Sequence, residues 1–511
     1  MLGKILPLSQ RLIFWWEVLI FLATVDWLKP NFSLCSGVNK SEFSSNINID
    51  FPSRLDVVVK KVLGDKFDNG LSVTELVDRL AEIESAFEAL KLDGLGKIFS
   101  GMVSILWPLA MLYAFSYMEH ASMKRVYFMF YVLTYAIVLG ISFSANMETL
   151  YLFYECLTFA TLPLIIQPMT KQSKKAGRLY IYFSLAGSAM AFIGLMFLLK
   201  FTQPTELSTD FIMGGNAQLL NGPVENLRFA YLLAFLGFGV KSAIFPLHMW
   251  LPLAGAAPTP TTALLHAVAV VKSGVFSLMR LTYYAVPLAL VKGYWTQTVV
   301  MCIAIFTIVY GSMRALKETH FKRRLAYSTI SNLSYIVFGI TLMSEFGLQA
   351  AVLHLLFHSI CKITLFFSCG IAMHKTHINY IYELDGLGKK MPITFGCFFV
   401  SALSLTGIPL FAGFISKYYL ASAALEANTS LAFVGIVALI ISALLTAVYS
   451  LSICFRAFMN KPTELSQKAY EIAHDGDIKY NLPIVVFSIL CVVFGICSSG
   501  LINLISSLVA F

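Results

Sequence analysis

Long apolar runs recur along the chain, separated by short polar stretches. A helix that crosses a bilayer needs about 20 mostly apolar residues. Runs of suitable length lie near residues 98–118, 126–145, 148–168, 179–200, 228–251, 261–281, 295–315, 326–343, 350–373, 393–424, 430–456 and 481–509, and a weaker run covers 12–29. This pattern predicts an all-α polytopic membrane protein in which helix packs against helix within the bilayer, with about 13 to 14 transmembrane helices.

Composition supports the membrane interpretation. Of the 511 residues, 58% are hydrophobic and 13% are charged, with a mean hydropathy of +0.75, whereas soluble domains carry about 25% charged residues. The net charge of +9 is explained by basic loops in alternate positions, with no Lys or Arg in the loops near 202–226, 344–348 and 425–429, so no nucleic-acid partner is expected. The basic loops contain Lys124 and Arg125, then Lys171 to Arg178, then Lys317 to Arg324, then Lys375 to Lys390, and then Arg456 to Lys468. The positive-inside rule predicts that these loops are cytoplasmic, which puts the start of the chain inside and Phe511 outside.

The N-terminal region departs from the membrane pattern. The run 12–29 contains Glu17 and Asp26 and lacks an A-x-A site, so we interpret it as a retained segment, with a cleaved signal peptide as the alternative. Residues 30–97 are polar at first, and apolar residues then recur at 77, 80, 83, 87 and 90. This spacing favours an amphipathic helix on the outer surface or at a partner subunit, and a simple tether is the alternative.

Cysteine usage argues against cofactor chemistry on this chain. The nine cysteines fall singly, without a CxxC pair. No disulfide framework, zinc site or iron–sulfur site is therefore predicted, and we expect neither a metal nor a cofactor. Any redox chemistry would belong to another chain.

Ionisable residues inside the apolar runs are the candidate functional groups. A charged side chain at the bilayer centre costs roughly 2.5 to 3.5 kcal/mol on insertion scales, so it needs a partner, water or a purpose. A single buried lysine is often structural, but several on separate runs, accompanied by a glutamate, favour a pathway for protons or cations. The candidates are Glu155, Lys241, His266, Lys272, His354, His358, Lys362 and Lys417. Arg280, Arg314 and Arg324 lie at run ends, where snorkelling to the surface explains them.

Spacing refines several of these candidates. Lys241 is the natural partner of Glu155 because opposite charges favour each other's charged form. His354, His358 and Lys362 follow an i, i+4, i+8 pattern on one helix face, which suits a proton relay better than zinc because neither an HExxH motif nor a third ligand accompanies them. His266 is either a core histidine or part of the same polar track as Lys272.

Two apolar segments combine a proline with a lysine. "GFGVKSAIFPLHMWLP" carries Lys241 and then Pro246, and "SLTGIPLFAGFISKYYL" carries Pro409 and then Lys417. Proline interrupts a helix, and an interrupted helix is tolerated at membrane depth only where it lines a cavity or is buried in protein. Such a pair of segments is typical of inverted repeats in transporters.

These segments, together with "APTPTTALLHAVAVVKSGVFSLMR", "FKRRLAYSTISNLSYIVFGI" and "LHLLFHSICKITLFFSCGI", resemble the antiporter-like subunits shared by respiratory complex I, Mrp-type sodium/proton antiporters and membrane-bound hydrogenases. The resemblance implies two inverted five-helix repeats, roughly 126–281 and 295–456, each with a broken helix. It divides the chain into an N-terminal region 1–97, a core 98–460 and a C-terminal part 461–511.

The resemblance also assigns roles. Glu155 matches the family's glutamate and Lys241 its partner lysine, Lys272 matches the central lysine, and His358 with Lys362 match the connecting pair. Lys417 matches the terminal lysine of the second broken helix. Two departures stand out: family members commonly have fourteen spans that start outside, and some carry an additional acid that the run 179–200 lacks.

The implied function is translocation of H⁺, Na⁺ or both by a subunit of a larger complex in a prokaryotic plasma membrane, with the lipid bilayer and further membrane subunits, antiporter-like ones included, as partners. An Mrp-type antiporter or a membrane-bound hydrogenase or oxidoreductase is favoured. A complex I subunit, the membrane partner of an inorganic-carbon uptake system, and an inert scaffold are the alternatives.

Overall fold

The computed structural model describes residues 89–201 and 211–509. Within these ranges the chain is helical, apart from loops and isolated bridges, and nine of its helices are long and apolar enough to cross a membrane. The expected all-α membrane fold is confirmed. The run 12–29 and positions 77 to 87 of the apolar spacing lie outside the described residues, whereas Leu90 lies in an isolated bridge with Ser144.

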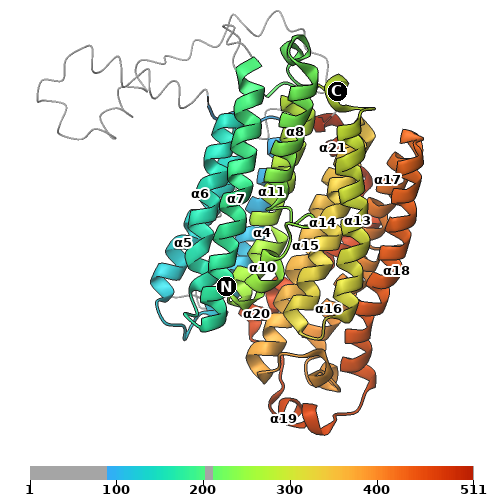
Figure 1. Ribbon diagram of the computed structural model, residues 1–511. Helices are drawn as coiled ribbons and strands as arrows, with labels where there is room; N and C mark the ends of the chain where they lie inside the picture. The colour runs from blue at the N-terminus through green and yellow to red at the C-terminus, as the bar shows by residue number, and fades with distance from the viewer. Residues whose placement is uncertain (1–88, 202–210, 510–511) are drawn as a thin grey trace, which may run out of the picture.

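The first half of the core consists of five successive helical elements. They are α5 (Lys124–Phe143), α6 (Met147–Ile166), α7 (Lys171–Phe201), the interrupted pair α8 (Val224–Gly239) and α9 (Trp250–Leu253), and the pair α10 (Thr259–Ala267) and α11 (Val270–Arg280). Figure 1 shows α5, α6 and α7 at one edge of the bundle, with α10 and α11 nearer its centre.

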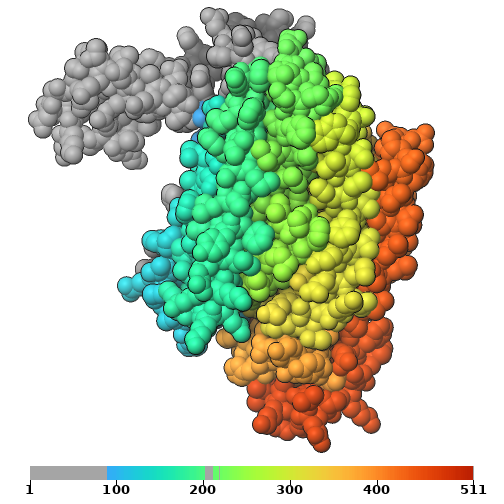
Figure 2. All heavy atoms as spheres, in the orientation of Figure 1, coloured from blue at the N-terminus to red at the C-terminus, as the bar shows by residue number. Residues whose placement is uncertain are grey.

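The second half repeats this order. It consists of α13 (Trp295–Lys317), α14 (Phe321–Thr341), α15 (Glu345–Thr376), the interrupted pair α16 (Pro392–Thr406) and α17 (Ala412–Ala427), and α18 (Ser430–Met459). The fourth element is interrupted in both halves. In the space-filling view the two halves lie side by side, with residues of the first in teal and green and those of the second in yellow to orange (Figure 2).

The interruption after α8 has a clear local cause. Pro246 has no amide hydrogen to continue a helical ladder, and Ala243 adopts a left-handed conformation with φ of 56°. The indole of Trp250 donates to the carbonyl of Val240 over 2.8 Å, and Thr307 Oγ1 accepts from the amide of Phe245 over 3.1 Å. Backbone groups that the break releases are thereby satisfied inside the protein, as membrane depth requires.

The interruption between α16 and α17 uses a different device. Gly407 ends α16 in a left-handed conformation with φ of 92°, and Pro409 follows. The freed carbonyls of Leu405 and Thr406 accept hydrogen bonds from Lys417 Nζ over 2.7 and 2.9 Å. A side chain that the sequence marks as ionisable therefore completes the helix end.

Two apolar runs divide differently from the expectation. The runs 261–281 and 481–509 were each expected to form a single helix. The first is interrupted between α10 and α11, and the second forms α20 (Ile478–Ile496) and α21 (Ser499–Val509). The run 393–424 consists of two helices, as its proline indicates. Hydropathy reports the apolar length of a segment and is insensitive to breaks whose backbone groups find partners within the protein.

Candidate functional site

The candidate ionisable side chains lie on the central helices α11 and α15 and on the elements that flank them. Lys241, His266, Lys272, His354, His358 and Lys362 are buried, with exposures between 0% and 2%. Glu155 and Lys417 are half-buried. The buried ones would be costly in an apolar core without polar partners, so their contacts identify what each can do.

Lys241 does not form an ion pair with Glu155. Its ammonium lies 3.5 Å from the centroid of the Tyr154 ring and donates to the carbonyl of Tyr154. Glu155 is the next residue of α6, and its Oε1 is buried with no hydrogen-bond partner among the described residues. No direct Glu155–Lys241 bridge forms, because the break after α8 places the lysine against the backbone and ring of α6. Because Glu155 directly follows the residue whose carbonyl accepts from Lys241, its carboxylate stays within Coulomb range of the ammonium.

Lys272 contacts His358 directly. The Nζ of Lys272 on α11 lies 2.6 Å from Nδ1 of His358 on α15. An ammonium has only hydrogens to offer, so a charged Lys272 donates to this ring nitrogen. A lysine of the first half and a histidine of the second half therefore meet in a buried contact through which a proton can pass.

His354 extends this line of contacts toward the second broken helix. We call the line, which consists of Lys241, Lys272, His358, His354 and Lys417, the row. Its Nδ1 lies 2.9 Å from Oγ of Ser416 on α17, and its ring lies 6.0 Å from that of His358. Tyr335 stacks on His354 at 5.3 Å, and Lys417 Nζ lies 5.3 Å from the centroid of the same tyrosine. His354 and Lys417 thus share a neighbour at the end of the row.

Lys362 leaves this line. Its Nζ donates to the carbonyl of Leu325 over 3.1 Å and to the hydroxyl of Ser328, both on α14. The i, i+4, i+8 spacing does place His354, His358 and Lys362 on one helix, α15. Their polar ends nevertheless reach three different elements, because α15 is surrounded by helices.

His266 lies in an apolar setting. It is 0% exposed, its ring lies 4.6 Å from that of Phe366, and neither ring nitrogen has a hydrogen-bond partner among the described residues. The interruption between α10 and α11 separates it from Lys272, so the two do not share a continuous helix as the sequence indicated. These contacts fit two roles for His266: a core histidine, or an additional proton acceptor beside the row.

The break that carries Lys241 packs directly on the helix of Lys272. A Cβ on Gly274 would lie 2.6 Å from the amide nitrogen of Ser242 and 2.8 Å from the carbonyl carbon of Lys241. The hydroxyls of Ser242 and Ser273 are buried there without partners among the described residues. Gly274 therefore sets the separation between Lys241 and Lys272, with polar groups between them.

We expect Gly274→Ala to push α11 away from this break. Overpacking of a tight core costs roughly 1 to 3 kcal/mol, so the purified protein should melt at a lower temperature and ion transport should fall. The matched control is Gly101→Ala on α4 (Gly94–Tyr117), where a Cβ meets nothing within 4 Å. Equal behaviour of the two variants would contradict a role for Gly274 in spacing the lysines.

Two arginines are buried rather than snorkelling. Arg280 is 0% exposed and binds both carboxylate oxygens of Asp93, one of them over 2.6 Å. Arg324 is 5% exposed and donates to the carbonyls of Glu318 and Tyr449, among others. The explanation of these two by snorkelling is wrong, because other elements supply acceptors at the ends of their helices. The partner of Arg280 comes from a distant part of the sequence and carries no local signal.

His248 is a further buried histidine outside the expected set. It is 2% exposed, lies in the break near Pro246, and neither of its ring nitrogens has a partner in the described part of the chain. Its ring packs on Phe245 and, edge-on at 5.0 Å, on Tyr310. A histidine in "PLHMW", two residues after a helix-breaking proline, is the signal that could have identified it.

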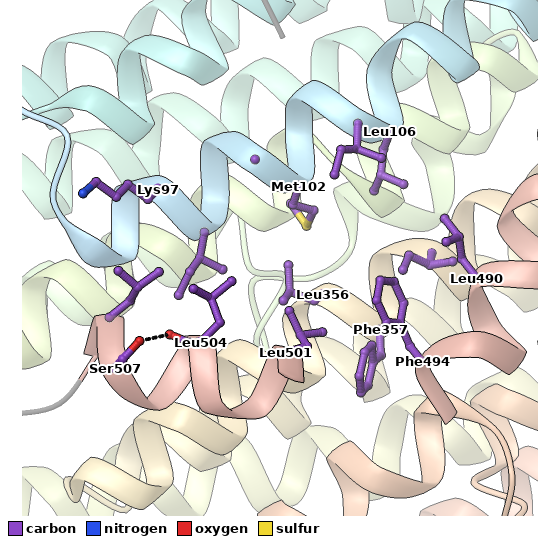
Figure 3. Close-up of a pocket in the computed structure, with 15 residues that line it drawn as sticks. Lys97, Met102, Leu106, Leu356, Phe357, Leu490, Phe494, Leu501, Leu504 and Ser507 are labelled. Atoms are coloured by element: carbon purple, nitrogen blue, oxygen red, sulfur yellow. Dashed lines mark hydrogen bonds between the residues drawn. The ribbon is translucent and has the colours of Figure 1, made fainter. Parts of the chain in front are cut away.

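A groove of about 380 Å³ lies apart from the row, between α4, α15, α20 and α21. Figure 3 shows Met102 and Leu106 of α4 facing Leu501 and Leu504 of α21, with Lys97 at one end. The hydroxyl of Ser507 donates to the carbonyl of Leu504 over 2.9 Å. This apolar lining supplies no cation ligands, so the row of ionisable residues remains the candidate site.

The chain is similar to known membrane proteins. The family described as NADH:quinone oxidoreductase/Mrp antiporter, TM, matches residues 144–446. The Na(+)/H(+) antiporter subunit A1 of Staphylococcus aureus is 30% identical over 437 residues, which cover 81% of this chain and 53% of that protein. The chain thus spans about half the length of the curated relatives it matches.

Two solved structures share the fold. The Mrp complex from Dietzia sp. DQ12-45-1b contains a chain that matches with a TM-score of 0.70 and 23% identity, covering 82% of this chain and 84% of that one. The membrane-bound sulfane sulfur reductase, an archaeal respiratory membrane complex, matches with a TM-score of 0.70 and 23% identity over 81% of each chain. At this level of identity the likeness concerns the fold alone.

Proposed function

The chain belongs to the NADH:quinone oxidoreductase/Mrp antiporter transmembrane family, and from this premise we propose that it is an ion-translocating membrane subunit that moves protons along its buried row of lysines and histidines. The contact between Lys272 and His358 carries the proposal. Two groups that exchange protons readily lie within hydrogen-bond distance in a core where an isolated charge would be expensive.

The row supports a stepwise mechanism. Glu155 would move relative to Lys241 when a neighbouring subunit changes shape, which alters how strongly Lys241 holds its proton. Lys241 would then favour or oppose a charge on Lys272 across the packed break, and the proton would pass through His358 toward Lys417. One charge moved against 100 mV needs about 2.3 kcal/mol, an amount that a change in one buried electrostatic contact can supply.

Lys417, at the end of the row, lies at a helix terminus. Lys417 binds two carbonyls at the C-terminal end of α16, where the helix dipole favours a positive charge. A proton that reaches Lys417 is thereby stabilised at the interruption of the second half. Lys241 and Lys417 would form two ends of one pathway, each next to a broken helix.

The relatives favour an Mrp-type assembly. The curated relatives are antiporter subunits whose names state exchange of Na⁺ for H⁺, and one of the matching folds comes from an Mrp complex. We therefore propose an Mrp-type sodium/proton antiporter in the plasma membrane, with further membrane subunits as partners and the basic loops on the cytoplasmic side. Purification of the native assembly tests this: co-purifying iron–sulfur proteins would point to an oxidoreductase of the kind represented by the reductase complex.

We expect Lys241→Ala and Glu155→Gln each to lower proton and sodium transport at least tenfold in proteoliposomes containing the assembled complex. The lysine supplies the first station, and the carboxylate supplies the charge that modulates it. Lys174→Ala, at an exposed position on α7, is the control. Undiminished transport in both variants would contradict the proposed pathway. A deletion strain that grows poorly only at low inorganic carbon would instead favour a role in carbon uptake.

A further inference from the structure

We propose that Ser416 is a positioning residue that holds His354 in the tautomer protonated on Nδ1, so that Nε2 is the nitrogen that receives a proton from the His358 side. The inference rests on the proposed function and deepens it, because it adds a residue outside the expected set and gives each histidine a defined direction. It follows from three contacts of buried groups.

The first contact identifies the donor between serine and histidine. Ser416 Oγ lies 2.9 Å from His354 Nδ1 and 3.2 Å from the carbonyl of Gly413. A hydroxyl has a single hydrogen, and a carbonyl can only accept. Both contacts are hydrogen bonds only if Ser416 donates to Gly413 and accepts from Nδ1–H of His354. The reverse arrangement would leave two acceptors facing each other in a core where unmade hydrogen bonds are costly.

The second contact gives His358 the opposite tautomer. The ammonium of Lys272 donates to Nδ1 of His358 over 2.6 Å, so the hydrogen of a neutral His358 lies on Nε2. His354 has its hydrogen on Nδ1 and a lone pair on Nε2. The Nε2 atoms of both rings are buried and have no partner among the described residues.

The third contact brings the two rings near each other. The rings of His354 and His358 lie 6.0 Å apart on successive turns of α15, with 29° between their planes. One ring presents an Nε2–H donor and the other an Nε2 acceptor. If both histidines had the same tautomer, this pair would be two donors or two acceptors, and no proton could pass between them.

The proton movement balances at every atom. Lys272 gives a proton to Nδ1 of His358, which then releases its Nε2 proton. Because the two Nε2 atoms are not hydrogen-bonded to each other, a ring rotation or one intervening water carries this proton to Nε2 of His354. Lys272 is left as a neutral amine, His358 as the Nδ1–H tautomer, and His354 as an imidazolium whose Nδ1–H stays bound to Ser416. The charge then lies beside Tyr335, against which Lys417 also packs. The ionisable groups around His354 are thus His358 and Lys272 on one side and Lys417 on the other.

The proposal predicts a specific pattern of substitutions. Ser416→Ala removes the acceptor for Nδ1–H, so the preference for this tautomer is lost and transport should fall at least tenfold in proteoliposomes. Ser416→Thr keeps the hydroxyl and should retain most of the transport. Ser450→Ala is the matched control, because Ser450 is a buried serine whose hydroxyl donates to the carbonyl of Thr446 in its own helix and, within the described residues, to no other element. It should behave like the unmodified complex.

A spectroscopic measurement separates positioning from simple packing. Nitrogen-15 NMR of the reconstituted, histidine-labelled complex reports which ring nitrogen carries the hydrogen, and His354→Gln identifies the signals of His354. We expect a protonated Nδ1 in the unmodified and Ser416→Thr complexes and a changed tautomer in Ser416→Ala. An unchanged tautomer in Ser416→Ala, or a His354 that is protonated on Nε2 from the start, would overturn the proposal. Full transport in His354→Gln would count against the proposed pathway, whereas the NMR result would still decide the role of Ser416.

Discussion

Replacing Lys272 by methionine is expected to abolish ion transport while the complex still assembles. Methionine fills nearly the same volume but offers neither a charge nor a hydrogen for Nδ1 of His358. A proton would then have to pass the centre of the row without its lysine station. Carrying a charge through the bilayer centre unassisted costs roughly 2.5 to 3.5 kcal/mol, so the rate should fall by roughly 70- to 370-fold, at about 1.36 kcal/mol per factor of ten. Proton and sodium flux in proteoliposomes is the measurement.

The same substitution has a second consequence for stability. Lys272 is 0% exposed, and an apolar side chain of similar size removes the cost of burying its amine. It also leaves Nδ1 of His358 without its donor, which costs roughly 1 to 3 kcal/mol, so the variant should melt near the temperature of the unmodified complex or slightly below it. Lys174→Met on the exposed face of α7 controls for the loss of a lysine as such. Transport at the unmodified rate by a folded Lys272→Met complex would show that protons bypass the row.

Replacing Asp93 by asparagine is expected to cause the largest loss of stability among the changes considered. It leaves the guanidinium of Arg280 charged and buried, with a weaker acceptor in place of two carboxylate oxygens. Removing one partner of a buried pair costs roughly 3 to 5 kcal/mol. Asp93 also caps α4 by accepting from the amide of Gly96 over 2.9 Å, a contact that asparagine can preserve. The measurement is the melting temperature of the purified complex.

A compensating variant makes this prediction sharp. Asp93→Asn combined with Arg280→Met removes the unpaired charge and should recover most of the lost stability, since three aromatic rings near the guanidinium can pack against methionine instead. These rings belong to Phe211, Phe276 and Tyr284. Arg228→Met is the comparison for the loss of an arginine as such. The guanidinium of Arg228 packs on the ring of Tyr294 at 3.3 Å and does not contact Asp93. A double variant as unstable as the single one would mean that the pair does not act through its charge.

The candidate site shows what can be predicted from the sequence and what cannot. Lys241, Lys272, His358 and Lys417 were identifiable because an ionisable residue in an apolar run is expensive and therefore informative. The partners of these residues were not identifiable. Tyr154 in place of Glu155 as the contact of Lys241, and the carbonyls of α16 as the contacts of Lys417, depend on where two breaks direct the side chains.

The sequence by itself determined that the chain is helical, that it lies in a membrane, that it carries two interrupted segments, and which side chains bear charge within it. Hydropathy, proline chemistry and the cost of buried charge act locally along the chain, so these features are legible residue by residue. Only the tertiary structure decided that Lys272 meets His358, that Ser416 meets His354, and that Arg280 is paired with Asp93 instead of reaching the surface. Each of these contacts joins elements far apart in sequence, and their geometry depends on how closely the helices pack, which no local pattern records.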